Sequence, residues 1–152
     1  MRNRTLLVFL VLTLGCGLAI ALACPPGAWY AGLPKPRFNP PDWVFPPAWT
    51  VLYVLVAIAG ARTWRRRRQG AAMWLWFLQM ALNFAWSPTF FAMHDMLAAL
   101  IVILALLVAS VAFIALAWRH DRLSALLFLP YAAWLAFAAT LNGAILHLSG
   151  GI

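Results

Sequence analysis

Acidic residues are scarce in this chain of 152 residues: there are three aspartates and no glutamate, and charged residues make up 9% of the composition. Asp42, Asp95 and Asp121 are far apart in the sequence, and no pair of histidines or cysteines has the spacing of metal ligands. No paired-carboxylate, nucleophilic or metal-based catalytic set is visible. We therefore expect no metal site, no obligatory cofactor and no conventional enzyme activity.

Cysteine is almost as rare, with only two in the chain. Cys16 and Cys24 fall in the same apolar run and are two helical turns apart, which is about 12 Å if that run is a helix. That distance excludes a disulfide between them, so we interpret both as inert apolar side chains.

Hydrophobic residues, in contrast, make up 66% of the chain, far above the level of soluble globular proteins. They are arranged in uncharged runs of the length that a helix needs to cross a bilayer. The sequence therefore predicts an all-α integral membrane protein with a single domain over residues 1–152. Its bundle would have five transmembrane helices, at about 5–24, 46–63, 71–91, 97–118 and 123–147.

The first run could also be a cleaved signal peptide, because it follows two arginines and ends in the small-x-small pattern Ala21-Leu22-Ala23. It is, however, longer than the apolar core of a usual signal peptide. We expect it to be retained as the first helix.

Residues 25–45, between the first two predicted helices, form what we call the cap loop. The stretch Trp29 to Tyr53, which includes most of this loop, contains six prolines. Because proline fixes φ and favours extended conformations in the residue before it, this segment cannot be one helix. We expect a stiff, partly extended and aromatic loop that is suited to covering a site.

The formal net charge of +8 is a topology signal in this chain. Only Lys35 and Arg37 of the eleven basic residues lie on the side of the cap loop and the C-terminus. Positive charge favours the cytoplasmic side, so we expect the N-terminus and the Arg65–Arg68 loop in the cytoplasm, and the cap loop and C-terminus opposite. The short basic clusters between apolar runs argue against nucleic-acid binding.

Several tryptophans and amides lie inside the predicted helices. Counted along each helix, Trp49, Asn83, Trp86 and Asn142 share the half of the membrane under the cap loop, with Trp134 deeper as a floor. An amide in hydrocarbon needs a partner and should therefore face the bundle interior. Each amide by itself could simply hold two helices together. Taken together with the indoles, the amides favour a pocket.

Such a pocket would have an aromatic, uncharged base and two cations, Lys35 and Arg37, at its mouth. Planar rings stack on indole faces, and carboxylates pair with cations outside the hydrocarbon. A tetrapyrrole fits this description.

Three sequence blocks resemble the TspO/translocator protein family. They are W-Y-x-x-L-x-K-P with N-P-P-x-W-x-F-x-x-x-W-T-x-L-Y at 29–53, Q-x-x-L-N-x-x-W at 79–86, and P-Y-x-x-W-x-x-F-A-x-x-L-N at 130–142. The family binds porphyrins and haem, so the resemblance implies a membrane receptor or carrier that acts in porphyrin transport, sensing or stress-linked regulation. By motif position, it implies a pocket made of Tyr30, Pro40, Trp49, Tyr53, Asn83, Trp86, Trp134 and Ala138. With the residues proposed above, the candidate ligand site also includes Lys35, Arg37 and Asn142.

The resemblance implies two further properties and leaves alternatives open. Family members tend to form homodimers, and some promote light-dependent porphyrin breakdown, in which Trp49 and Trp134 would take part. The sterol-recognition pattern of animal members is missing after Asn142, so we do not expect sterol binding there. The alternatives are a small passive transporter and a purely structural membrane protein. Ion-coupled transport is disfavoured because the spans lack an embedded ionisable residue.

Overall fold

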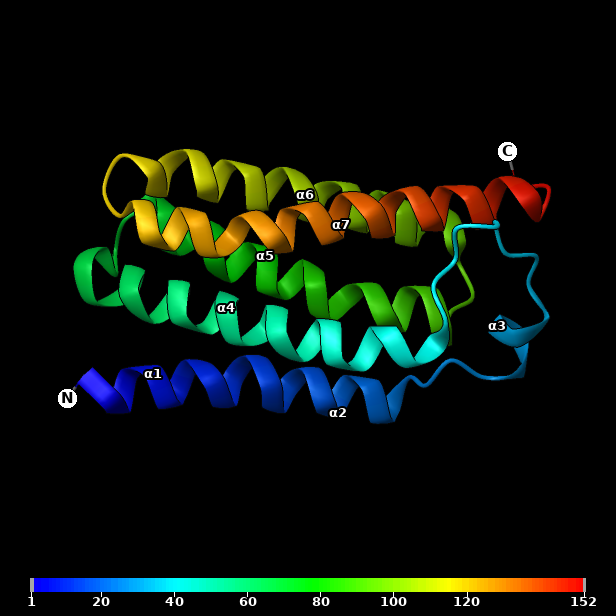
Figure 1. Ribbon diagram of the computed structural model, residues 1–152, viewed down its shortest axis with the longest axis horizontal. Helices are drawn as coiled ribbons and strands as arrows, with labels where there is room; N and C mark the ends of the chain where they lie inside the picture. The colour runs from blue at the N-terminus through cyan, green and yellow to red at the C-terminus, as the bar shows by residue number, and fades with distance from the viewer. Residues whose placement is uncertain (1, 152) are drawn as a thin grey trace.

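The computed structural model describes residues 2–151, which fold as a bundle of long helices (Figure 1). The first helical rod consists of α1, a π-helical turn η1, and α2. A loop with the short helices α3 and η2 leads to α4, and the remaining helices follow after short turns. The bounds are α1 Arg2–Leu10, η1 Val11–Gly15, α2 Cys16–Ala23, α3 Ala28–Gly32, η2 Asp42–Val44, α4 Phe45–Arg67, α5 Ala71–Ser87, η3 Pro88–Ala92, α6 Met96–Trp118 and α7 Arg122–Leu148.

Within residues 2–151, four helical segments are long and apolar enough to cross a membrane: Asn3–Ala23, Asp42–Arg67, Met96–Trp118 and Arg122–Leu148. Their outward faces are rich in exposed leucine, valine and isoleucine, which in water would be an aggregation hazard and in lipid are the expected surface. The helices are those of an integral multi-pass membrane protein.

Two expected helix bounds need correction. The second helix does not end near Thr63 but continues to Arg67, so most of the expected Arg65–Arg68 loop is its last helical turn. Arginine is a good helix former, and basic side chains are favourable at a helix C-terminus, so the charges extend the helix beyond the apolar stretch. The third helix stops being α-helical at Ser87, where η3 begins with Pro88, because proline has no N–H to donate to the preceding turn.

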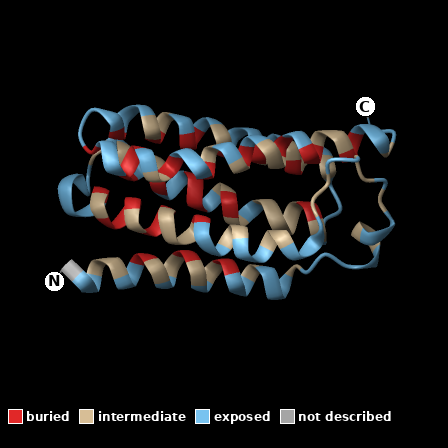
Figure 2. Ribbon diagram, viewed as in Figure 1, coloured by how far each residue is buried: buried red, intermediate tan, exposed pale blue. Residues whose placement is uncertain are grey.

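The long helices pack side by side around a core of buried aromatic side chains. The first rod packs on α4, α4 packs on α7, α7 on α6, and α6 on α5, while α5 also contacts α4 and α2. Trp76, Phe113, Phe128 and Tyr131 are completely buried, and the buried residues of the long helices face the interior of the bundle (Figure 2).

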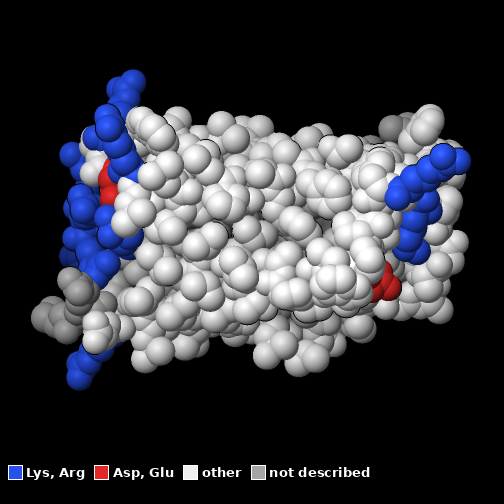
Figure 3. All heavy atoms as spheres, viewed as in Figure 1, with Lys and Arg blue, Asp and Glu red and all other residues white. Residues whose placement is uncertain are grey.

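Charge divides the molecule into two ends. Figure 3 shows a large basic patch around an acidic residue at one end of the bundle and a smaller basic patch next to an acidic residue at the other. The N-terminus and the turns after α4 and α6 lie at the first end, and the cap loop and C-terminus at the second (Figure 1). This division confirms that the cap loop lies opposite the arginine-rich end.

An ion pair joins α4 to the turn before α7. Arg62 donates from Nε to Oδ2 of Asp121 at 2.9 Å and from a terminal nitrogen to Oδ1 at 2.8 Å. Ser124 donates to the same carboxylate at 2.7 Å. Burial by itself raises the pKa of Asp121, but the bonds from Arg62 and Ser124 and the charges of Arg62 and Arg66 outweigh it and lower the pKa to about 2.

Candidate functional site

The predicted aromatic residues of α4 and α7 lie together near the end of the bundle that carries the cap loop. The ring of Trp49 is 5.4 Å from that of Tyr53 and 6.4 Å from those of Tyr131 and Trp134. Phe45 contacts Trp134 edge to face at 5.9 Å. Because Trp49 and Tyr53 are four residues apart, one face of α4 presents both rings to α7.

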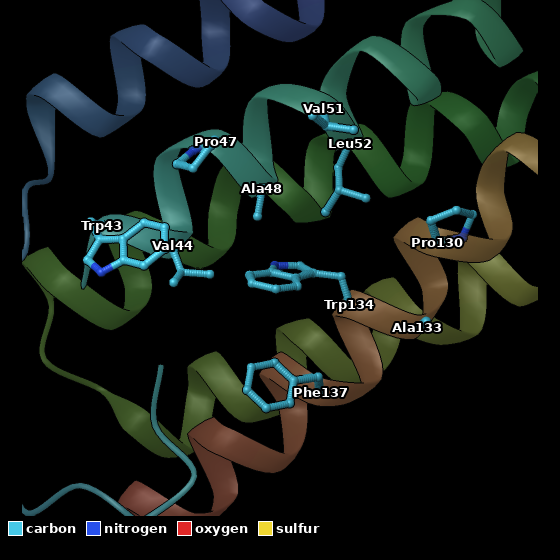
Figure 4. A pocket seen from close by; sticks show the side chains of 10 residues that line it. All are labelled: Trp43, Val44, Pro47, Ala48, Val51, Leu52, Pro130, Ala133, Trp134 and Phe137. Carbon is cyan, nitrogen blue, oxygen red and sulfur yellow. The ribbon is translucent and has the colours of Figure 1, made fainter. Parts of the chain in front are cut away.

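A groove lies on the outer seam between α4 and α7, directly over Trp134 (Figure 4). Its volume is about 680 Å³, and its lining is almost entirely apolar. Figure 4 shows the Trp134 indole extending from α7 toward α4 across the middle of the groove, with Phe137 beside it. The lining residues are Trp43, Val44, Pro47, Ala48, Val51, Leu52, Pro130, Ala133, Trp134 and Phe137.

The indole N–H of Trp134 is buried and has no hydrogen-bond acceptor within the described part of the chain. A buried donor without a partner costs about 1 to 3 kcal/mol, so such groups are rare in folded proteins. The indole ring of Trp134 lines the groove, while its N–H is enclosed by the surrounding side chains.

Four polar side chains form a hydrogen-bonded chain inside the bundle, beside the groove. Tyr53 donates its hydroxyl to Oδ1 of Asn83 at 2.8 Å, and Nδ2 of Asn83 donates to the hydroxyl of Tyr131 at 2.9 Å. Tyr131 in turn donates to Oε1 of Gln79 at 2.8 Å. The chain links α4, α5 and α7, so Asn83 holds helices together at this depth, as the simpler sequence interpretation allowed.

The first rod also supports this region. The π turn η1 brings Thr13 to α4, where its hydroxyl donates to the carbonyl oxygen of Tyr53 at 3.1 Å. Gly17 then packs directly against the Tyr53 ring, where a side chain would have no room. The position of Tyr53 is therefore fixed from both sides.

Other predicted site residues form a second group nearer the cap loop. Trp86 stacks on Phe90 at 5.2 Å, and its N–H donates to Oδ1 of Asn142 at 3.3 Å. Asn142 donates onward to the carbonyl oxygen of Met96 at 3.0 Å. Tyr30 of α3 contacts Phe90 edge to face at 6.1 Å. This group anchors the cap loop to η3 and α7, and the amide of Asn142 both accepts and donates a hydrogen bond.

The remaining predicted residues are spread around these two groups. Lys35 is turned back onto α3, where its ammonium donates to the carbonyl oxygen of Tyr30 at 2.7 Å and lies 4.4 Å from the ring centre. Arg37 is exposed and Pro40 is half-buried in the cap loop. Ala138 is half-buried on α7 and packs against the main core. The structure thus brings Trp49, Tyr53, Asn83, Trp134 and Ala138 to one region but does not bring all eleven predicted residues into one cavity.

Sequence reasoning missed Tyr131 and most of the groove. Tyr131 is completely buried and joins Asn83 to Gln79. Its place in the third sequence block and inside an apolar run were the signals that could have found it. The groove residues around Pro47 and Ala133 carry no signal, since small and apolar residues occur on every face of a membrane helix. Only the side-by-side packing of α4 and α7 shows that they share a surface.

A sequence model described as the TspO/MBR family matches residues 7–148. The chain belongs to the TspO/MBR family. It is 37% identical to Protein CrtK of Rhodobacter capsulatus over 98% of this chain and 96% of that protein. It is also 39% identical to the tryptophan-rich protein TspO of Archaeoglobus fulgidus, with 93% and 94% covered, and 36% identical to the human translocator protein, with 85% of each chain covered.

The match to TspO proteins spans every long helix and the cap loop. It therefore confirms the resemblance seen in the three sequence blocks, which include Trp49, Asn83 and Trp134. The tryptophans of those blocks are the residues that converge on the groove and on η3.

Replacing Tyr131 with phenylalanine tests the interior hydrogen-bonded chain. We expect a loss of about 1 to 2 kcal/mol in the free energy of unfolding, because Nδ2 of Asn83 and Oε1 of Gln79 both lose their partner. Tyr53→Phe is the matched control, since it removes a single bond and should cost about half as much. Unfolding by dodecyl sulfate in mixed micelles measures both, and equal costs would contradict the ranking.

Proposed function

We propose that this protein binds a tetrapyrrole, such as protoporphyrin or haem, in the aromatic groove between α4 and α7. The observation on which this rests is the groove over Trp134, whose volume of about 680 Å³ lies within the usual range for small-molecule sites. Its aromatic walls offer ring faces and edges to a flat macrocycle. A rotation of the Trp134 ring would bring its buried, unpartnered N–H to an acceptor atom of the ligand.

The groove opens on the outer side of the bundle, where Trp43 and Val51 are 73% and 58% exposed. In a bilayer that face meets lipid, so the ligand enters sideways from the membrane in our proposal. A hydrophobic macrocycle partitions into the bilayer before it binds. Its carboxylates would point toward the headgroup layer at the cap-loop end, where Arg37 is exposed.

The membrane arrangement that we propose has five spans. In addition to the four long apolar segments, α5 continued by η3 forms a span. Residues 71–92 together reach about 30 Å, which is the thickness of the hydrocarbon core. The arginine-rich end would face the cytoplasm and the cap loop the opposite side. In this arrangement the protein acts as a receptor or carrier for the tetrapyrrole, in transport or sensing, and it acts as a homodimer.

Quenching of tryptophan fluorescence by protoporphyrin IX in lipid nanodiscs tests the groove. We expect saturable binding that Trp134→Phe weakens about tenfold, because the N–H is lost while an aromatic ring is kept. Trp118→Phe is the control, since Trp118 is an exposed tryptophan at the other end of the bundle.

A second pair of variants separates the groove from the bundle interior. Ala133→Trp fills the groove and should abolish saturable quenching, whereas Ala136→Trp, exposed on α7 but not part of the groove, should leave it unchanged. Quenching that is linear and indifferent to all these substitutions would mean that the porphyrin only partitions into lipid. Loss of binding in Asn83→Leu with normal binding in Ala133→Trp would place the ligand in the interior and contradict the groove.

A further inference from the structure

The end of the bundle opposite the cap loop carries a dense group of arginines (Figure 3). They come from three separate parts of the chain: the start of α1, the last turns of α4, and the turn between α6 and α7. Only one acidic residue, Asp121, lies among them in the described part of the chain. The arginines are Arg4, Arg62, Arg65, Arg66, Arg67, Arg68, Arg119 and Arg122.

The single carboxylate at this end is already fully used. It accepts two hydrogen bonds from Arg62 and one from Ser124, and Arg66 lies 3.5 Å from Oδ2. Arg65 donates instead to the carbonyl oxygen of Ala61 at 3.1 Å. The structure thus accounts for three arginines within the protein.

Five arginines at this end have no such partner: Arg4 at the start of α1, and four that belong to the end of α4 and the α6–α7 turn. Arg67 and Arg68 close α4, while Arg119 and Arg122 flank the turn before α7, and all four are exposed. Among the described residues, no carboxylate or carbonyl oxygen accepts a hydrogen bond from the guanidinium group of any of these four. The Asp121 ion pair ties the α6–α7 turn to α4, so these two pairs of guanidinium groups stand on joined elements.

Exposed tryptophans place these arginines at a definite depth. Trp74 and Trp118, near the ends of α5 and α6 on this side, are 70% and 45% exposed. Exposed indoles at helix ends mark the boundary between hydrocarbon and headgroups. In a bilayer the unpaired arginines would then lie just beyond that boundary, at the level of lipid phosphates.

We propose that this end is a binding site for the phosphate groups of anionic phospholipids. A guanidinium group presents two parallel N–H donors that match a phosphate, and this pairing is stronger than a neutral hydrogen bond. The headgroups would bridge Arg67 and Arg68 to Arg119 and Arg122 and so brace the two turns against each other. The site is separate from the groove over Trp134, which lies toward the other end of α4.

Native mass spectrometry of the purified protein in neutral detergent, titrated with phosphatidylglycerol and with phosphatidylcholine, tests this site. We expect several phosphatidylglycerol molecules to bind more tightly than phosphatidylcholine. Arg67→Gln with Arg68→Gln should weaken that binding by roughly 30-fold, about fivefold for each arginine. Lys35→Gln with Arg37→Gln removes the same charge from the cap loop and should leave the affinity unchanged.

Two outcomes would overturn the proposal. Equal affinity for the two lipids, or equal losses in the two double variants, would mean that the arginines are only a topology signal or act through net charge. Inorganic phosphate added in excess should not displace the lipid, and displacement would reassign the site to soluble phosphates. Near-ultraviolet circular dichroism identical to the wild type shows that the double variant is folded, and working in detergent removes any effect of the substitutions on membrane orientation.

Discussion

Asp121→Asn is expected to lower the free energy of unfolding by about 3 kcal/mol, although the change removes no apolar contact. Asp121 is 9% exposed, and its carboxylate holds Arg62 with two bonds, so the variant leaves a partly buried guanidinium without a counter-charge. Breaking such a pair costs several kcal/mol because the remaining charge stays desolvated. Thermal unfolding in detergent at neutral pH measures the loss. Asp42→Asn, at an exposed aspartate of the cap loop, should change stability by less than about 0.5 kcal/mol.

The same ion pair predicts a pH dependence. A carboxylate whose pKa is lower in the folded than in the unfolded chain stabilises the fold at every pH above the unfolded value, which is about 3.9 for aspartate. Since the folded pKa is about 2, this stabilisation is lost as the pH falls from about 4 through 2. The chain has only two other side-chain carboxylates, which makes the acid response unusually simple to assign. The measurement is the midpoint temperature of thermal unfolding between pH 5 and pH 2. If this temperature changed with pH no more in the wild type than in Asp121→Asn, the account would be contradicted.

Gly60→Ala is expected to destabilise the protein by about 3 kcal/mol, and Gly60→Leu to prevent folding. A Cβ atom at Gly60 would lie 2.5 Å from Cε2 of Trp76 and 2.7 Å from Cδ1 of Phe9. Trp76 cannot move aside easily, because it is completely buried and its N–H donates to the carbonyl oxygen of Val56 at 3.0 Å. Overpacking of a fixed core forces rotamer and backbone shifts that cost 1 to 3 kcal/mol or more.

Gly143→Ala is the matched control for this overpacking. Gly143 is also inside a long helix, but the nearest atom to an added Cβ would be Cδ1 of Leu100 at 3.9 Å, an ordinary contact. Alanine is a better helix former than glycine, so this variant should be neutral or more stable by up to about 1 kcal/mol. Dodecyl sulfate unfolding of the two variants side by side measures the difference, and a similar loss in both would mean that close packing at Gly60 is not the cause.

Much of the fold follows from composition and spacing. Uncharged runs of about 20 residues can bury their backbone in lipid only as helices, so the long helices were predictable within a few residues. The bounds that were missed, at Arg67 and at Pro88, depend on helix-end chemistry and on the missing N–H of proline, which a hydropathy pattern does not record.

The candidate site was only partly predictable. Helical spacing correctly places Trp49 with Tyr53 on one face of α4, because residues four apart share a face. It cannot show that Asn83 pairs with both Tyr53 and Tyr131, nor that Trp86 belongs with Asn142 nearer the cap loop. Those pairings depend on which helices are neighbours and how far each is rotated.

The sequence by itself determined the family, the helical membrane character and the opposition of the cap loop to the arginine-rich end, because each of these is written in local motifs, run lengths and charge counts. Tertiary structure alone decided which polar groups are satisfied and which are not. It pairs Arg62 with Asp121 across 59 residues of chain, links Asn83 to Gln79 through Tyr131, and leaves the buried N–H of Trp134 without an acceptor in the described part of the chain. The physical reason is that a residue's hydrogen-bond partner and the space next to it depend on helix packing, which no single stretch of sequence contains.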